Sequence, residues 1–179
     1  VTPYKILVSE LMLQQTQVPR VTPKYKAFLS AFPNFGTLAR ASRTDVLEHW
    51  QCLGYNRRAI NLKRAAETVT AHHNSRLPDA YNELITLPGI GPYTARAVQA
   101  FAFNVPSVFI ETNIRTVFFH HFFSGHGQIH DAELTPLIEQ TLDTDNPREW
   151  YYALMDYGTH LKQHGYGANQ KSRHYTRQS

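Results

Sequence analysis

The segment Leu87-Pro88-Gly89-Ile90-Gly91-Pro92-Tyr93-Thr94 decides how this chain folds. An apolar stretch with helical spacing precedes it at residues 81–85, and another follows it at residues 97–101. Two glycines one residue apart permit the positive φ and the close backbone approach of a tight turn, and Ile90 between them can plug the core. The segment therefore predicts two helices joined by a hairpin.

The same hairpin predicts a site for an anion. The amide groups of such a turn face outward with the N-terminus of the next helix, so they can bind an anionic oxygen without any side chain. A phosphodiester fits this site, and backbone contacts of this kind position a protein on DNA without reading its bases. Most Gly-x-Gly pairs are ordinary helix-to-helix turns, but the longer Leu-Pro-Gly-Ile-Gly-Pro string favours the phosphate site.

Composition describes a globular protein. The 179 residues are 42% hydrophobic, 18% charged and 12% aromatic, which excludes disordered, collagen-like and coiled-coil chains. No apolar run reaches the ~20 residues of a membrane helix, and no secretory signal stands at the start, so we expect an intracellular protein. The single cysteine, Cys52, excludes an internal disulfide and a cysteine-ligated metal site.

Charge is distributed unevenly along the chain. Residues 1–76 hold 11 Lys/Arg against 4 Asp/Glu, residues 77–156 hold 3 against 10, and residues 157–179 hold 4 against none. Basic ends around an acidic middle can present one positive face to a polyanion. A merely solubilising surface is the alternative, and charge alone favours nucleic acid only slightly.

Helix signals recur along the whole chain, whereas strand signals are scarce. Thr2-Pro3, Thr22-Pro23 and Asn146-Pro147 each resemble an N-cap followed by a proline in the first helical turn. Ser42 with Asp45 three residues later resembles a capping box. We therefore predict an all-α fold of roughly eight to ten short helices.

The hairpin string resembles the helix–hairpin–helix motif of the DNA base-excision glycosylase superfamily, which includes endonuclease III and the MutY adenine glycosylases. Ser9–Val18 resembles the MutY segment that bears the catalytic glutamate. Leu53-Gly54-Tyr55 resembles the family's Gly-Leu-Gly-Tyr turn, with Cys52 where a glycine is usual, and Met155-Asp156-Tyr157-Gly158 also matches MutY. The resemblance covers nearly the whole chain and implies the all-α helix–hairpin–helix glycosylase fold, with two helical lobes and a cleft between them.

The domain organisation expected from this resemblance is one glycosylase domain over residues 1–164. A six-helix-type lobe would span roughly residues 20–125 and contain the hairpin at 87–94. The second lobe would combine residues 1–19 with residues 126–164. Residues 165–179 lose helical periodicity and are expected to form a basic C-terminal arm.

Glu10 is the candidate general acid. Breaking an N-glycosidic bond requires an acid that protonates the departing base and a carboxylate that faces the cationic sugar, after the base has left the duplex. Ile6, Glu10 and Gln14 align on the first helix with Leu7 and Leu11 alongside, so apolar surroundings should raise the pKa of Glu10. Position alone favours an exposed or arginine-paired glutamate, and the match to MutY reverses that preference.

Glu111 is the candidate for the second carboxylate. It precedes Thr112-Asn113-Ile114, where the family has an aspartate in an Asp-x-Asn pattern at the start of a helix. The extra methylene moves the carboxylate by on the order of an ångström, and such a shift can cost about a hundredfold in rate. A shifted but active site, a different substrate and lost catalysis all stay open, as does a purely capping acid that complements the helix dipole.

The other site residues follow from the resemblance. Tyr93 stands where bifunctional relatives carry a Schiff-base lysine, which implies a glycosylase without strand-cleaving lyase activity, unless Tyr93 merely packs on the next helix. Gln14 and Gln15 match residues that contact the base opposite the excised one, and an amide can read a base edge. Four basic residues, Arg57, Arg58, Lys63 and Arg64, are expected to form a solvated basic face. The predicted catalytic residues are Glu10, Glu111 and Tyr93, and the predicted DNA-binding residues are Gln14, Gln15, Thr16, Leu87, Gly89, Ile90, Gly91, Thr94, Asn113 and Arg57.

No metal or cofactor is expected. MutY and endonuclease III usually carry four cysteines that hold a [4Fe–4S] cluster, and residues 157–179 contain none, so we predict that the cluster is absent. His160 and His164 have a spacing that could bind zinc on a helix, but no cysteine or carboxylate supplements them nearby.

The sequence therefore predicts a monofunctional base-excision DNA glycosylase that removes adenine from a mismatch. We expect a monomer in the cytoplasm or nucleoid, away from membranes, acting on double-stranded DNA with a damaged or mismatched base. One alternative is a glycosylase for uracil, thymine or hypoxanthine. Another is a helix–hairpin–helix protein that binds DNA or lesions without catalysis.

Overall fold

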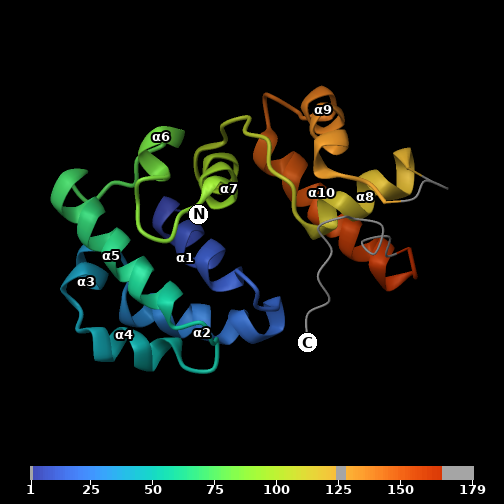
Figure 1. Ribbon diagram of the computed structural model, residues 1–179. Coiled ribbons are helices and arrows are strands. Elements are labelled where there is room, and N and C mark those ends of the chain that lie inside the picture. The colour runs from blue at the N-terminus through green and yellow to red at the C-terminus, as the bar shows by residue number, and fades with distance from the viewer. Residues whose placement is uncertain (1, 124–127, 167–179) are drawn as a thin grey trace. The chain divides into compact units, whose positions relative to one another are not determined.

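The computed structural model describes residues 2–123 and 128–166 (Figure 1). Within these residues every regular element is a helix, which confirms the predicted all-α class. The chain divides into two compact units, Val1–Phe103 and Asn104–Ser179. In the described part of the chain, no helix is both long and apolar enough to cross a membrane.

The first unit is built around helix α1, which is the most apolar helix of the chain's first half. Its side chains at positions 4, 6, 7, 8, 11 and 12 are buried, and α1 packs against α2, α5 and α7 of the same unit. Phe28 and Trp50 are fully buried and meet edge to face, with ring centroids 5.8 Å apart. The helices of this unit are α1 (Pro3–Leu13), α2 (Val18–Ala31), α3 (Phe35–Arg40), α4 (Arg43–Trp50), α5 (Arg57–His72), α6 (Tyr81–Leu84) and α7 (Pro92–Phe103).

Most of the predicted helix starts are correct, and one is wrong. The capping box is present at α4, where Ser42 accepts from the Asp45 backbone N–H and Asp45 accepts from that of Ser42. Helix α1 begins at Pro3, as expected. Thr22-Pro23 does not start a helix, because α2 already begins at Val18 and Pro23 lies inside it. The Thr22 hydroxyl donates instead to the Val18 carbonyl at 2.9 Å.

The second unit packs α8 (Thr112–Phe122) against α10 (Pro147–Gln163), with α9 (Asp131–Thr141) between them in sequence. Tyr151 of α10 is fully buried, stacks on Phe109 at 4.1 Å between ring centroids, and donates its hydroxyl hydrogen to the Ser107 carbonyl at 2.9 Å. These contacts tie the irregular segment 104–111 to α10, and this segment leads directly into Glu111. The start of α10 at Pro147 agrees with the prediction from Asn146-Pro147.

The two units do not divide the chain where the predicted lobes do. The prediction joins residues 1–19 to residues 126–164, whereas in the structure α1 packs with α2, α5 and α7 in the unit Val1–Phe103. The physical reason is the apolar surface of α1, which is buried by helices that follow it closely in sequence. Of the predicted basic arm at 165–179, residues 167–179 lie outside the described residues.

Candidate functional site

The predicted hairpin is present between α6 and α7. The chain leaves α6 in a series of tight turns, with the Leu87 N–H donating to the Leu84 carbonyl and the Ile90 N–H to the Leu87 carbonyl, each at 3.1 Å. Leu87 and Ile90 are buried, as expected for residues that pin the turn to the core. Their side chains are therefore structural, and any contact they make with DNA must come from the backbone.

The two glycines of the hairpin have different roles. Gly89 has φ +81°, and a Cβ there would lie 2.7 Å from the Asn61 Cβ of α5, so both its conformation and its packing require glycine. Gly91 has no positive φ and no atom within 4 Å of where a Cβ would stand. Of the two glycines that permit this tight turn, Gly89 supplies both the positive φ and the close approach, and Gly91 supplies neither.

Two amides of the hairpin are free to bind a ligand. Within the described residues, the backbone N–H groups of Gly89 and Gly91 donate to no acceptor, while the Gly91 carbonyl accepts from the Ala95 N–H at 2.9 Å and so opens α7. Both glycines are exposed. Free amides beside the positive end of a 12-residue helix are suited to an anionic oxygen.

Gln14 lies next to this hairpin. It follows the last residue of α1, and its Nε2 donates to the Thr94 hydroxyl of α7 at 3.1 Å. Thr94 is buried, so its hydroxyl holds the glutamine side chain rather than reaching solvent. The structure therefore brings together two of the predicted DNA-binding residues, Gln14 and Thr94, which are 80 positions apart in sequence.

Arg58, predicted to lie on a solvated face, is buried and connects the end of α1 to the turn that contains Leu53 and Gly54. The Arg58 guanidinium donates to the carbonyls of Leu11 and Met12 at 3.0 and 2.8 Å, and on its other side to those of Leu53 and Gly54 at 3.1 Å each. It also donates to the Gln14 carbonyl and to the Thr16 hydroxyl. Burial lowers the pKa of Arg58 from its usual value. We call this group of contacts the Arg58 clamp.

The Arg58 clamp surrounds a cluster of unusual backbone conformations. Gln15, Cys52 and Tyr55 have φ of 56°, 71° and 46°, the left-handed region that costs a non-glycine residue about 1 kcal/mol or more. The carbonyl of Cys52 also accepts from the Arg20 side chain. All three strained residues are exposed, so the clamp presents the side chains of Gln15 and Tyr55 to solvent on a fixed backbone.

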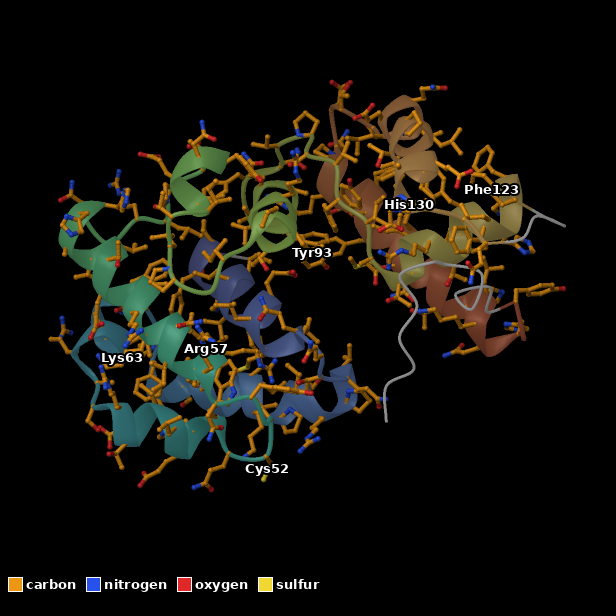
Figure 2. The ribbon with its side chains drawn as sticks, viewed as in Figure 1. Cys52, Arg57, Lys63, Tyr93, Phe123 and His130 are labelled. Carbon is orange, nitrogen blue, oxygen red and sulfur yellow. The ribbon has the colours of Figure 1, made fainter. Side chains whose placement is uncertain are left out.

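Four residues around this region are labelled in Figure 2. Tyr93 lies in the first turn of α7 and is 41% exposed, so it does not fill the core. Arg57 lies exposed in the first turn of α5, and Cys52 is exposed in the α4–α5 connection. Lys63 is buried, which contradicts the predicted solvated face, because it donates to the Ala39 carbonyl at 3.1 Å and pairs with Glu67.

Glu10, the predicted acid, lies on α1 among buried residues. Ile6, Leu7 and Leu11, its neighbours at helical spacing, are all buried, and Glu10 itself is half-buried. This is the apolar stripe that the sequence predicts for it. The raised pKa expected for Glu10 stays a prediction.

Glu111, the second predicted carboxylate, caps α8. Its Oε1 accepts from the backbone N–H groups of Asn113 and Ile114 at 2.6 and 2.9 Å. Its Oε2 accepts no hydrogen bond from the residues that the structure describes. The carboxylate thus performs the helix-capping role and keeps one oxygen available for another partner.

Opposing influences act on the Glu111 carboxyl. Its burial raises its pKa above the usual value, while the Ile114 amide, the Lys162 charge, the Asn113 amide and the Arg115 charge each lower it. The net direction is upward, so desolvation is the strongest of these influences. A carboxylate in such surroundings is costly to ionise, and a partly desolvated anion interacts strongly with a nearby positive charge.

Asn113, predicted to contact DNA, is engaged on the protein side. Its Oδ1 accepts from the Lys162 Nζ of α10 at 2.5 Å. Gly158 permits this approach, since a Cβ at Gly158 would lie 2.5 Å from the Asn113 carbonyl oxygen. Arg115 likewise binds within the protein, through two hydrogen bonds of 2.7 and 2.6 Å to the Asp131 carboxylate.

The residues of this chain do not fit an iron–sulfur cluster. Such clusters are held by four cysteine thiolates, and the chain has one cysteine, the exposed Cys52. His160 and His164 lie with ring centroids 4.2 Å apart, but across the described residues no three histidine, cysteine or acidic side chains gather where a metal ion could bind.

Two contacts of the candidate site have no signal in the sequence, the buried Arg58 clamp and the hydrogen bond from Lys162 to Asn113. Arg58 also contacts the nearby Leu53 and Gly54, but its other hydrogen-bond partners and the partner of Lys162 lie 42–49 positions away in sequence. Only the match of Gly158 to a family motif pointed to this part of α10, and it carries no information about Lys162.

Comparison with known proteins connects these features to a family. The family model described as "HhH-GPD superfamily base excision DNA repair protein" matches residues 8–142. The chain is 36% identical over 160 residues to the adenine DNA glycosylase of Buchnera aphidicola subsp. Baizongia pistaciae, covering 87% of this chain and 45% of that protein. It is 44% identical over 117 residues to the adenine DNA glycosylase of Mycobacterium tuberculosis, covering 65% of this chain and 38% of that protein.

Among solved structures, a thermostable thymine-DNA glycosylase superposes with a TM-score of 0.75 at 26% identity, covering 88% of this chain and 74% of that one. The chain spans less than half the length of the two adenine DNA glycosylases. The matched segment contains Glu10, the Arg58 clamp, the hairpin and Glu111. The chain therefore belongs to the HhH-GPD superfamily of base excision DNA repair proteins.

Proposed function

We propose that this chain is the glycosylase domain of a base-excision repair enzyme that hydrolyses the N-glycosidic bond of a flipped-out adenine in a mismatch. The observation that carries the proposal is the half-buried Glu111 carboxyl, one oxygen of which accepts no hydrogen bond from the described residues, in a chain whose relatives include adenine DNA glycosylases. A desolvated carboxylate is suited to facing a developing sugar cation.

In the proposed reaction, the bond between the base nitrogen and the sugar C1′ breaks with its electron pair leaving on the base. Glu10 protonates the departing base, and the apolar neighbours Leu7 and Leu11 support a proton-carrying carboxyl there. Glu111 stabilises the sugar cation and accepts a proton from the water that adds to C1′. Tyr93, exposed in the first turn of α7, contacts the extruded nucleotide in this proposal.

DNA is held in the proposal by groups of the first unit. The free amides of Gly89 and Gly91 bind a phosphate, and Thr94 fixes Gln14. Gln15, exposed on a backbone that the Arg58 clamp fixes, contacts the base opposite the excised one. Arg57, exposed at the start of α5, supplies a positive charge for the DNA backbone.

Absence of lyase activity is part of the proposal. Tyr93 cannot form an imine with the sugar, because a phenol has no amine to attack C1′. Lys63, a lysine of the same unit, is buried and occupied by the Ala39 carbonyl and by Glu67. We therefore expect an intact strand with an abasic site as the product.

A panel of duplexes tests the activity. Adenine opposite 8-oxoguanine, A·G, G·T, G·U and a hypoxanthine pair are incubated with excess protein, and strand cleavage is measured with and without alkali. We expect base release from the adenine duplexes, revealed only after alkali, and loss of release in Glu10→Gln and Glu111→Gln. Glu139→Gln, at an exposed position on α9, is the matched control and should behave as the wild type.

Three results would overturn parts of this proposal. Absence of base release from every duplex removes catalysis and leaves a protein that only binds DNA. Strand cleavage without alkali removes the monofunctional assignment. Release of thymine from G·T changes the substrate, and this second candidate is favoured by the 26% identity to a thymine-DNA glycosylase.

A further inference from the structure

The cation nearest to Glu111 in the hydrogen-bond network comes from the opposite helix of its unit. Lys162, near the end of α10, donates from Nζ to Asn113 Oδ1 at 2.5 Å. The backbone N–H of Asn113 in turn donates to Glu111 Oε1 at 2.6 Å. Lys162, Asn113 and Glu111 thus form a continuous chain of polar contacts at the start of α8.

Close helix packing keeps this arrangement in place. Gly158 lies one helical turn before Lys162, and residues four apart share a face of a helix. The space where a Cβ of Gly158 would stand is filled by the backbone of Asn113. The face of α10 that carries Lys162 is therefore pressed against the N-terminus of α8.

Two positively charged side chains act on Glu111, and Lys162 has the stronger effect on its carboxylate. Arg115 of α8 also faces Glu111, but its guanidinium makes two hydrogen bonds to Asp131 of α9, whose negative charge compensates it. The ion pairs found among the described residues include none for Lys162. Burial lowers the pKa of Lys162 and the charge of Glu111 raises it, so the two groups favour each other's charged forms.

We propose that Lys162 is a positioning residue of the candidate catalytic site, holding the Asn113 side chain at the start of α8 and keeping Glu111 in its anionic form. The inference rests on the function proposed above, because that function needs an anion at Glu111. The ammonium group donates to the side-chain oxygen Oδ1 of Asn113 and not to the Glu111 carboxylate. Oε2 of Glu111 is thus left for the sugar cation.

The pH dependence of base release tests this role. In single turnover, the rate should fall at low pH as Glu111 becomes protonated. In Lys162→Met the stabilising charge is gone, so protonation begins at a higher pH and the acid limb of the profile moves upward. We expect about a three- to tenfold lower rate on the acid limb and less than about a twofold change on the plateau.

Two matched variants separate charge from structure. Lys162→Arg keeps the cation and should restore the wild-type acid limb. Arg148→Gln removes one positive charge from the same helix, 14 residues earlier and so about 21 Å away along the axis. That distance exceeds the screening length of about 8–10 Å, so this variant should leave the profile unchanged.

A titration of the carboxyl group by ¹³C NMR makes the outcome independent of activity. The Glu111 resonance is assigned by its loss in Glu111→Gln, and its midpoint should be higher in Lys162→Met than in the wild type. An unchanged midpoint, or an equal loss of rate at every pH in Lys162→Met and Lys162→Arg, overturns the inference. A raised midpoint in a protein whose wild type releases no base removes the proposed function and leaves the coupling of Lys162 to Glu111 established.

Discussion

A methyl group at position 158 would collide with the backbone of α8. In Gly158→Ala the new Cβ would lie 2.5 Å from the Asn113 carbonyl oxygen and 2.7 Å from the Asn113 Cβ. Ordinary contact begins at 3.4 Å, so α8 and α10 must separate locally by about 0.9 Å. The obstacle is backbone, which cannot rotate away as a flexible side chain could.

The energetic cost of this change is moderate and the catalytic cost is large. Overpacking costs about 1–3 kcal/mol, and alanine returns up to about 1 kcal/mol of helix propensity, so the net loss of unfolding free energy should be about 0–2 kcal/mol. The displaced residue, Asn113, supplies one of the two amides that hold Glu111. A misplacement of about 1 Å can cost about a hundredfold in rate, so we expect a folded protein with about a hundredfold slower base release.

Thermal unfolding and single-turnover base release on the adenine duplex measure the two effects. Gly36→Ala is the control: its Cβ would meet its nearest atoms at 3.4 and 3.5 Å, so it should leave activity unchanged and stability equal or slightly higher. Wild-type activity in a folded Gly158→Ala protein would refute the reasoning. It would mean that the contact between α10 and Asn113 does not control Glu111.

Three further substitutions test separate features of the site. Glu111→Gln should be more stable than the wild type at pH 8 and lose that advantage toward pH 5. Burial raises the folded-state pKa of Glu111, so the wild type loses stability as the pH rises above the usual carboxyl pKa, and the loss is complete above the raised value. Thermal unfolding at both pH values measures this, and a gap that does not shrink toward pH 5 would contradict it. Arg58→Met should lower the free energy of unfolding by about 3–5 kcal/mol, as measured by urea denaturation, because the carbonyls of the clamp lose their buried donor. A loss below about 1 kcal/mol would show that water replaces the guanidinium. Gly89→Ala should weaken duplex binding at least about tenfold by fluorescence anisotropy, because φ +81° and the 2.7 Å approach to Asn61 force the hairpin amides to move, and unchanged affinity would remove the hairpin from the DNA site.

Local signals account for what the sequence predicts correctly. The hairpin at 87–94 and the capping box at Ser42 each depend on residues within a few positions of one another, so their chemistry can be recognised in the sequence. The start of α2 is local too, but it was ambiguous: Pro19 and Pro23 both satisfy the φ of a first helical turn, and nothing in the sequence distinguishes them. The structure resolves this by placing Pro23 inside the helix.

The missed features depend on contacts between distant parts of the chain. A charged residue is expected at the surface unless buried polar groups are present to pair with it. For Arg58 these groups include the carbonyls of Leu11 and Met12, which lie 46–47 positions earlier in the sequence. Lys162 reaches Asn113 across 49 positions, through packing that only the folded unit creates. Sequence periodicity describes which face of a helix is apolar, but it does not identify the helix that will cover that face.

The glutamate at position 111 is the feature of the sequence that argues most against a working site, and its capping geometry answers part of that objection. Capping favours short side chains, yet Oε1 of Glu111 reaches the amides of Asn113 and Ile114, the second and third residues of α8. Because the helix fixes those two amides, a shorter acid that capped them would place its capping oxygen at about the same point, and the extra methylene of Glu111 must fit between that oxygen and the backbone. Only the position of Oε2 then differs between the two acids. Glu111→Asp should therefore change single-turnover base release by less than about tenfold, whereas a rise of about a hundredfold would mean that the methylene displaces the carboxylate from its working position.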